Sequence, residues 1–526
     1  MSGQRVHAGE RRKAGDSTPT SRLSREALRR RNQRLERELE RLREQLAERE
    51  RELAERDERI AEAEKQIGEA KKQIGDLERQ LAMRRQNSTT SSKPPSSDGL
   101  AGAPRRRGRR KTGTRRPGGQ PGHVGHHRSR VPIERVDTLV TLYPDQCGRC
   151  GRDLPPPEQG GARVGEPRRH QVTEIPDIRA HITEYQCHRL ACPDCGTTTM
   201  ARLPDDVAGS FGPQLTAWIV YMTVVCRMPR RMVQRFLGEA LQIEISVGST
   251  QKAWEEASAA VDLPYEQLRQ DLQQQPVVNG DETGHRTNAE KRWLWVMVAR
   301  TYVVYLIATS RKAEVLVALL GQAFNGIIGC DRCPSYAKYH TGTLQYCWAH
   351  FKRNILGALE LARTTEAERF CRDALALHAR LFRLWHRFRG DAPRRYARIT
   401  RRQLILKSIP LEQQFFALAE RHLENGDSKV RNLARALFVN FEHFFTFIDQ
   451  EHVEPTNNSA ERALRHAVIW RKIMFGNRSE AGEVAVARLL TIAATCKMQN
   501  RDALVYLTMA IRSHRRGEIP PSLLSK

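Results

Sequence analysis

This sequence of 526 residues has no apolar run long enough to cross a membrane. The longest, residues 216–226, falls well short of the roughly 20 residues that a membrane-spanning helix needs. Residues 1–15 include basic side chains without an apolar segment, so no secretory signal is predicted. We therefore expect a cytoplasmic protein with no membrane partner.

Acidic and aromatic residues are both scarce. Asp and Glu number 61 against 88 Lys and Arg, which gives a formal net charge of +27, and aromatic residues make up 6%. A surplus of positive charge is typical of proteins that bind nucleic acid. A hydrophobic content of 39% favours a folded body with polar appendages. Because one hydrophobic core stops growing at roughly 250–300 residues, we expect several domains.

Apolar residues recur every seven positions over residues 28–81, flanked by Glu and Arg. This spacing predicts a coiled coil over residues 22–86 that joins copies of the chain into a homo-oligomer. A single solvated helix is the alternative, because the second seam contains arginines. One seam is Asn32, Leu39, Leu46, Leu53, Ile60, Ile67, Ile74 and Leu81; the other is Leu28, Leu35, Leu42, Arg49, Arg56, Ala63, Ala70 and Leu77.

Residues 87–130 form a basic linker rich in Ser, Pro and Arg, and residues 100–130 contain no acid. Five of its arginines resemble a short hook that lies in A·T-rich minor grooves, where a narrow groove attracts arginine. A solvated linker that contacts phosphates without sequence preference is an equal alternative. The five are Arg105, Arg106, Arg107, Arg109 and Arg110.

Eleven cysteines in a cytosolic chain indicate free thiols or metal ligands rather than disulfides. Four of them form two Cys-x-x-Cys-Gly knuckles, in which both thiolates of a tight turn face one ion. We predict a structural zinc site within a zinc-ribbon-like domain over residues 131–204, with a strand in residues 170–187. The ligands are Cys147, Cys150, Cys192 and Cys195.

A second set of possible zinc ligands lies further along the chain. Neither of its pairs is followed by glycine, and two members end strand-like runs, so we disfavour this site. Its members are Cys330, Cys333, Cys347 and His350.

Residues 205–274 are predicted to be helical. Residues 229–241 and 246–259 read as two helices separated by a short break, which resembles a helix-turn-helix. Ser246, Ser249 or Thr250 could cap the second helix. An ordinary helical hairpin explains the pattern equally well.

Strands dominate the next stretch. A short strand over residues 276–280 ends at Asp281, residues 293–299 and 302–308 form a hairpin, and a strand over residues 326–330 ends at Asp331. In an RNase H-like fold the strands before the two aspartates are neighbours, so their carboxylates would converge. We expect residues 275–353 to form the first part of such a core.

The strands then stop, and residues 354–450 are predicted to be an all-helical insertion. Residues 383–402 contain eight arginines, among them Arg394 and Arg395, interleaved with Trp385, Phe388 and Tyr396. This composition suits a surface that contacts the DNA backbone and stacks on bases. A solvated helix face is the alternative.

Residues 451–515 are predicted to complete the core. A helix begins near Asn457 or Asn458 and carries Glu461 in its first turn. Cations follow, and such a carboxylate with cations beyond it fits a third metal ligand with phosphate-binding neighbours. Alone, Glu461 reads as a first-turn acid stabilised by the helix dipole. The cations are Arg462, Arg465, Arg471 and Lys472.

Together these segments resemble transposases of the insertion-sequence family numbered sixty-six, along essentially the whole chain. The resemblance is carried by the heptads, NSTTSSKPPSSD at 87–98, GGQPGH at 118–123 and the two knuckles. In the core it is carried by DET at 281–283, Asp331 with Tyr336, CWAH at 347–350, NNSAER at 457–462, and Arg471 with Lys472.

The resemblance implies a multidomain α+β protein with an RNase H-like catalytic core. It implies the catalytic triad Asp281, Asp331 and Glu461, which would hold two Mg²⁺ or Mn²⁺ ions. The implied reaction is hydrolytic nicking of the ends of a mobile DNA element, followed by attack of the freed 3′-hydroxyl on target DNA. Companion proteins of the same element and association with the bacterial nucleoid are also implied.

A non-enzymatic, zinc-containing DNA-binding regulator is the competing hypothesis. The coiled coil, the zinc site and the basic linker would serve it equally well. A pure binder, however, does not need carboxylates that face its anionic ligand. The three acids therefore favour the enzyme.

Overall fold

The computed structural model describes residues 20–85, 129–207, 209–391 and 396–524. The chain divides into two compact units, residues 1–86 and residues 87–526. Within the described residues, no helix combines the length and the apolar character needed to span a bilayer.

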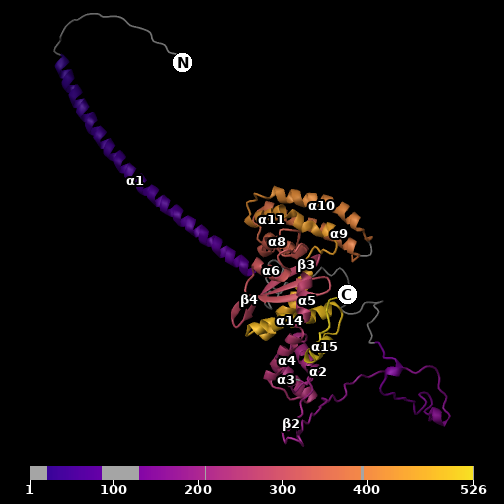
Figure 1. Ribbon diagram of the computed structural model, residues 1–526. Helices are drawn as coiled ribbons and strands as arrows, with labels where there is room; N and C mark the ends of the chain where they lie inside the picture. The colour runs from indigo at the N-terminus through magenta and orange to yellow at the C-terminus, as the bar shows by residue number, and fades with distance from the viewer. Residues whose placement is uncertain (1–19, 86–128, 208, 392–395, 525–526) are drawn as a thin grey trace. The chain divides into compact units, whose positions relative to one another are not determined.

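The first unit is one helix, α1 (Thr20–Arg85), shown in indigo in Figure 1. Its Glu, Arg, Ala and Leu content favours a helix, and ion pairs such as Arg49–Glu52 (3.0 Å) lie on its surface. The apolar seam is open to solvent in the single chain, with Leu46 and Leu53 60% and 57% exposed. Pairing of this seam with a second copy stays a prediction.

The second unit begins with a mostly irregular segment. It contains two single-turn helices, η2 (Ile133–Arg135) and η3 (Pro157–Gln159), and a small hairpin of β1 (Arg189–Ala191) with β2 (Thr198–Met200). The strand predicted over residues 170–187 is not present, because this stretch pairs with no other strand. Extended backbone needs a partner to form a ladder, which the pattern of side chains alone does not supply.

Four helices follow: α2 (Pro213–Val224), α3 (Arg230–Leu241), α4 (Val247–Ala260) and α5 (Asp262–Leu272). α2, α3 and α4 share a small core that includes Ile219, Val233 and Leu237. Ser246 caps α4, as the sequence suggested, and its hydroxyl accepts from Ser249 N at 3.0 Å. One face of α4 is buried against the rest of the unit, whereas α3 keeps an exposed face.

A five-stranded sheet forms the centre of the unit, with strand order β5-β4-β3-β6-β7. β3, β4 and β5 are an antiparallel meander, and β6 and β7 run parallel to β3. β3 is longer than predicted and continues through Asp281 instead of ending there. The strands are β3 (Val277–Thr287), β4 (Glu290–Val298), β5 (Val303–Ala308), β6 (Ile327–Cys330) and β7 (Leu344–Tyr346).

Both edges of this sheet are covered by helices. At β5, the backbone N–H groups of Val303 and Tyr305 donate to Thr495 and Thr491 on α14 (Glu480–Met498) at 3.2 and 2.9 Å. At β7, Thr446 on α12 (Phe441–Asp449) donates to Leu344 O at 2.6 Å. These side chains satisfy backbone groups that an open edge would leave unpaired.

The described part of residues 354–450 is helical, and its helices lie together beside the sheet in Figure 1. They are the rest of α8 (Trp348–Leu359), then α9 (Thr365–Arg389), α10 (Arg401–Arg421), α11 (Ser428–Val439) and α12. Trp348 and Phe444 are fully buried where this bundle meets β7. The remaining helices are α6 (Ala313–Leu320), α7 (Pro334–Tyr339), α13 (Asn458–Met474) and α15 (Ala503–Arg515).

Candidate active site

Asp281 and Asp331 lie at the same level of two neighbouring strands. Asn279 of β3 is paired with Gly329 of β6, and the two aspartates each follow two residues later. Parallel strands are about 4.8 Å apart, so the sheet itself brings both aspartates to one place. Asp281 lies within β3, just beyond the end of its pairing with β6.

Glu461 reaches the same place from the first turn of α13, which packs on β3 and β4. The residue before this helix, Asn457, is fixed by two hydrogen bonds. Its backbone N–H donates to Cys347 Sγ at 3.1 Å, and its side-chain Nδ2 donates to Gly280 O at 2.6 Å. Asn457 occupies the N-cap position that the sequence suggested, but its side chain makes no capping hydrogen bond.

The three acids share one electrostatic environment. Burial raises the pKa of Asp281 well above its ordinary value, and the nearby carboxylates Glu282, Asp331 and Glu461 raise it further. The hydrogen bond from Glu282 N to Asp281 Oδ1 (2.9 Å) acts in the opposite direction. Negative charge gathered in a half-buried place favours a cation as ligand.

The ligand atoms of the triad are not all in mutual contact. Among the described residues, two groups have ligand atoms within 4.8 Å of one another: Cys347, His350 and Glu461, and Glu282, Asp331 and Cys333. Asp281 belongs to neither group. Nor do the four disfavoured zinc ligands come together, because Cys347 and His350 group with Glu461.

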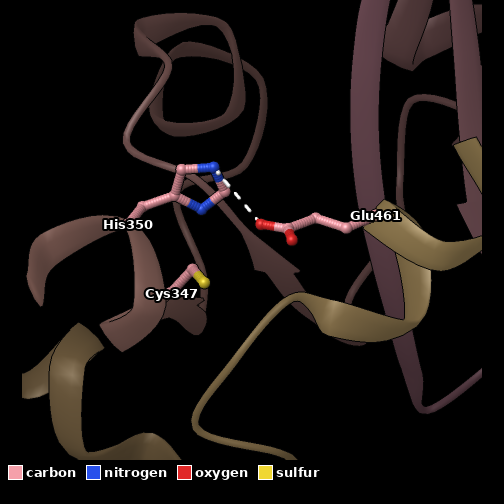
Figure 2. Close-up of side chains that lie close together, drawn as sticks. All are labelled: Cys347, His350 and Glu461. Atoms are coloured by element: carbon pink, nitrogen blue, oxygen red, sulfur yellow. Dashed lines mark ion pairs between the residues drawn. The ribbon is translucent and has the colours of Figure 1, made fainter. Parts of the chain in front are cut away.

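His350 is the neighbour of Glu461 that the sequence left without a role. Figure 2 shows its ring directed at the Glu461 carboxylate, with Nε2 3.4 Å from Oε1 and Cys347 beneath. Burial lowers the pKa of His350, so a neutral imidazole is favoured, and its Nδ1 has no hydrogen-bond partner. The CWAH motif was the sequence signal for this arrangement, since it places Cys347 and His350 at the start of α8.

The sequence also left Glu282 without a role. Its buried carboxylate is held by two neighbouring side chains. It accepts from Tyr336 Oη at 2.7 Å and pairs with Arg311 Nη2 at 2.6 Å. The Glu282 carboxylate also lies within 4.8 Å of the ligand atoms of Asp331 and Cys333. Tyr336 also lies close against Gly280, where an added Cβ would be 2.9 Å from Tyr336 Cε1.

The predicted cations of α13 divide by their place around the helix. At about 100° per residue, Arg465 and Lys472 fall on the stripe of Glu461, and both are exposed. Arg462 faces a groove of about 1110 Å³ that is also lined by Arg300, Arg389 and Arg401. Arg471 is half-buried near His285.

Seven of the predicted DNA-binding arginines lie outside the described residues, and the structure gives them no position. They are Arg105, Arg106, Arg107, Arg109, Arg110, Arg394 and Arg395.

The two cysteine knuckles have matching backbone conformations. The glycine after each, Gly151 and Gly196, has a φ of 71°, and its N–H donates at 2.9 Å to the carbonyl of Cys147 and Cys192, respectively. Glycine adopts this left-handed conformation without strain. Hydrogen bonds from Cys150 lower the pKa of Cys147. Among the described residues, the four thiols do not lie together as one group, and their shared zinc site stays a prediction.

Comparison with known proteins identifies the family. Residues 208–485, just over half of the chain, match the model of the transposase IS66 family, and residues 16–129 match a family of unknown function (DUF6444). Two similar curated proteins come from Sinorhizobium fredii (strain NBRC 101917 / NGR234). The uncharacterized protein y4qI is 27% identical over 43% of this chain and 44% of its own length. The uncharacterized protein y4hP is 22% identical over 71% of each chain.

The chain thus spans less than half the length of y4qI and about seven tenths of y4hP. The family match covers all three predicted acids together with the whole sheet. The chain belongs to the transposase IS66 family.

Proposed function

We propose that this protein is a DDE-type transposase that nicks the ends of a mobile DNA element and joins the freed 3′-hydroxyls to target DNA. The observation that carries the proposal is that Asp331, at the end of β6, and Glu461, on α13, lie close enough to Asp281 on β3 to raise its pKa. The strand order, with two parallel strands added beside an antiparallel meander, supports an RNase H-like core.

The donor set fits divalent metal ions. Asp281 is half-buried among other acids, and Glu461 Oε1 has no hydrogen-bond partner, so a bound cation would offset negative charge there. Oxygen ligands suit Mg²⁺ or Mn²⁺. Bound there, such ions would supply activation of the attacking hydroxyl and stabilisation of the leaving oxygen.

The protein's own residues position the reaction. We assign Asp281, Asp331 and Glu461 as metal ligands and His350 as a group that orients the Glu461 carboxylate. We assign Arg465 and Lys472, on the Glu461 stripe, to the phosphates of the scissile strand, with Arg462 and Arg471 on either side. Cationic side chains there would offset the charge of the DNA backbone.

Other segments would hold the DNA and assemble the complex. A basic cavity of about 440 Å³ between α9 and α10, lined by Arg380, Arg383, Arg387 and Lys407, supports backbone contacts by the helical insertion. We assign the two knuckles to a structural Zn²⁺ and α1 to pairing of two copies. The α3–α4 segment and the basic linker are candidates for reading the element ends, with companion proteins of the element as further partners.

A strand-nicking assay tests the proposal. A plasmid that carries this gene with its natural flanks would be incubated with the full chain and Mg²⁺. The isosteric variants Asp281→Asn, Asp331→Asn and Glu461→Gln would be compared with Glu314→Gln, which removes an exposed acid on α6.

We expect defined 3′-ends at the element borders from the wild type and Glu314→Gln. Each triad variant should lower the nicking rate by at least about a hundredfold, since each removes a charged metal ligand. Full nicking by any triad variant would contradict the assignment of that residue. Binding to the flanks without nicking, with companion proteins added, would favour the non-enzymatic regulator.

A further inference from the structure

A cavity of about 420 Å³ opens beside Asp331, where the end of β6, α8 and α11 meet. We call it the Arg332 cavity. Its wall includes Arg311, Asp331, Arg332, His350, Asn354 and Asn440. Small-molecule sites span roughly 300–1,000 Å³, so this space accommodates a ligand of the size of a nucleotide.

Arg332 is a half-buried cation held in a fixed position. Its guanidinium lies over the ring of Phe351, 5.1 Å from the centroid. With the Asn354 amide oriented so that its nitrogen donates to His350 O (2.7 Å), its oxygen accepts from Arg332 Nη2 at 2.8 Å. Both contacts hold the guanidinium at the cavity wall without neutralising its charge.

No carboxylate pairs with Arg332 among the residues that the structure describes. Arginine suits the planar, two-pronged recognition of phosphate. A half-buried arginine without an acid partner, one residue from a proposed catalytic acid, favours an anionic ligand in the cavity.

The rest of the wall adds features that a bare phosphate does not need. Arg311 contributes a second guanidinium, although it is already paired with Glu282. The helical insertion contributes Asn440, whose amide donates to Ala436 O at 2.9 Å. Side-chain amides recognise the hydrogen-bonding edges of bases. The cavity therefore joins a cationic wall near the acids to an amide that lies between α11 and α12.

We propose that the Arg332 cavity binds one nucleotide of the DNA strand next to the phosphate that is cut, with Arg332 on its phosphate and Asn440 toward its base. This inference rests on the proposed function, because it takes DNA as the substrate. It assigns the insertion a direct part in the site, because Ala436 of α11 and Asn440, which follows α11, line the cavity.

Photo-cross-linking of a mononucleotide tests the cavity without requiring cleavage. The full chain would be irradiated with 5-iodo-2′-deoxyuridine 5′-monophosphate in chelator, and the attachment sites would be mapped by mass spectrometry. The same nucleoside without phosphate, and an excess of inorganic phosphate, would be run in parallel. The variants would be Arg332→Gln, Asn440→Leu and the control Arg369→Gln, which removes an exposed arginine of α9.

We expect cross-links within residues 331–354 or 436–440. Their yield should fall at least about tenfold in Arg332→Gln and change less than about twofold in Arg369→Gln, because a charge-assisted hydrogen bond is lost only in the first. Asn440→Leu should also lower the yield. Inorganic phosphate should compete weakly, and the nucleoside should cross-link less than the nucleotide. Circular dichroism would show whether the variants are folded. If Arg332→Gln is not folded, Arg332→Lys, which keeps the positive charge, would be used in its place.

Equal yields in Arg332→Gln and Arg369→Gln, or cross-links confined to other segments, would overturn the inference. Strong competition by inorganic phosphate with no effect of Asn440→Leu would also overturn it, in favour of a plain anion site. The nicking assay separates the two proposals. Wild-type nicking without a cavity cross-link defeats only the nucleotide site, and a cavity cross-link without nicking defeats only the transposase chemistry.

Discussion

Asn457 donates a hydrogen bond from Nδ2 to the carbonyl oxygen of Gly280 at 2.6 Å. This bond ties the start of the helix that carries Glu461 to the strand residue directly before Asp281. The backbone N–H of Asn457 also donates to Cys347 Sγ, and Cys347 directly follows Tyr346, which pairs with Cys330 where β7 meets β6. One buried amide thus sets the spacing of two proposed catalytic acids.

Replacing Asn457 with Ala should impair nicking more than it impairs folding. The lost buried hydrogen bond should lower the free energy of unfolding by about 1–3 kcal/mol. The nicking rate at saturating DNA should fall at least about tenfold, because Glu461 would no longer be held relative to Asp281. Asn458→Ala, at the exposed neighbouring position, is the control. A nicking rate that falls equally in both variants would contradict the role of Asn457.

Gly280→Ala should destabilise the core. The added Cβ would lie 2.9 Å from Tyr336 Cε1 and 3.0 Å from Met297 Cε, inside van der Waals contact. We expect a loss of about 1–3 kcal/mol in the free energy of unfolding, measured by urea denaturation. Gly284→Ala on the same strand meets no atom within 4 Å and should change stability far less. Similar losses in both would show that strand propensity, not crowding by Tyr336, is responsible.

The metal-free protein should become less stable as the pH rises. Burial and the nearby acids raise the pKa of Asp281 above its unfolded value, so the folded state binds more protons than the unfolded chain. The free energy of unfolding therefore falls as the pH rises from about 4 through the raised pKa of Asp281. In chelator, the midpoint of urea denaturation should fall less between about pH 5 and about pH 8 in Asp281→Asn than in the wild type. Added Mg²⁺ should stabilise the wild type more than the variant. A steeper fall in the variant would contradict this account.

The knuckles should bind one zinc ion per chain. Serine at Cys147, Cys150, Cys192 or Cys195 should abolish stoichiometric zinc and make residues 131–204 sensitive to protease, because a closed tetrahedral site needs all four thiolates. Cys187→Ser is the control, since Cys187 lies outside the knuckle spacing. Zinc content would be measured by atomic emission. Retention of one zinc by a knuckle variant would refute the four-cysteine site.

The seam of α1 should be the interface between copies. Leu46→Lys combined with Leu53→Lys places charge on two exposed seam positions and should yield monomers in sedimentation velocity. Glu48→Lys combined with Glu55→Lys makes a larger change of net charge off the seam and should leave the oligomer intact. Dissociation in both would indicate a charge effect instead of a seam.

Local sequence patterns predicted much of the fold. The apolar, β-branched hairpin and the short strand β6 were predicted within a few residues, as was the Ser246 cap of α4. Asp331 follows the end of its strand as predicted, whereas β3 continues through Asp281. The strand predicted over residues 170–187 failed, since alternation alone does not supply a pairing partner.

The contacts that complete the site could not be predicted from the sequence. Asn457 and Gly280 are 177 positions apart, and Asn457 read as an ordinary helix cap. Nothing in the sequence near Arg332 showed that Phe351 and Asn354 would hold its guanidinium in place. Such roles depend on which distant segments meet, and hydrophobic periodicity does not encode that.

The covered sheet edges have a consequence for the order of synthesis. β3 to β7 emerge from the ribosome before Thr446, Thr491 and Thr495, the residues that cap their outer edges. Glu461 follows Asp331 by more than a hundred residues, or on the order of ten seconds of translation. A nascent or prematurely terminated chain therefore exposes two strand edges and lacks the third acid. Such a chain would retain the segments proposed to bind DNA without the means to cut it, and would compete with the complete enzyme at the element ends.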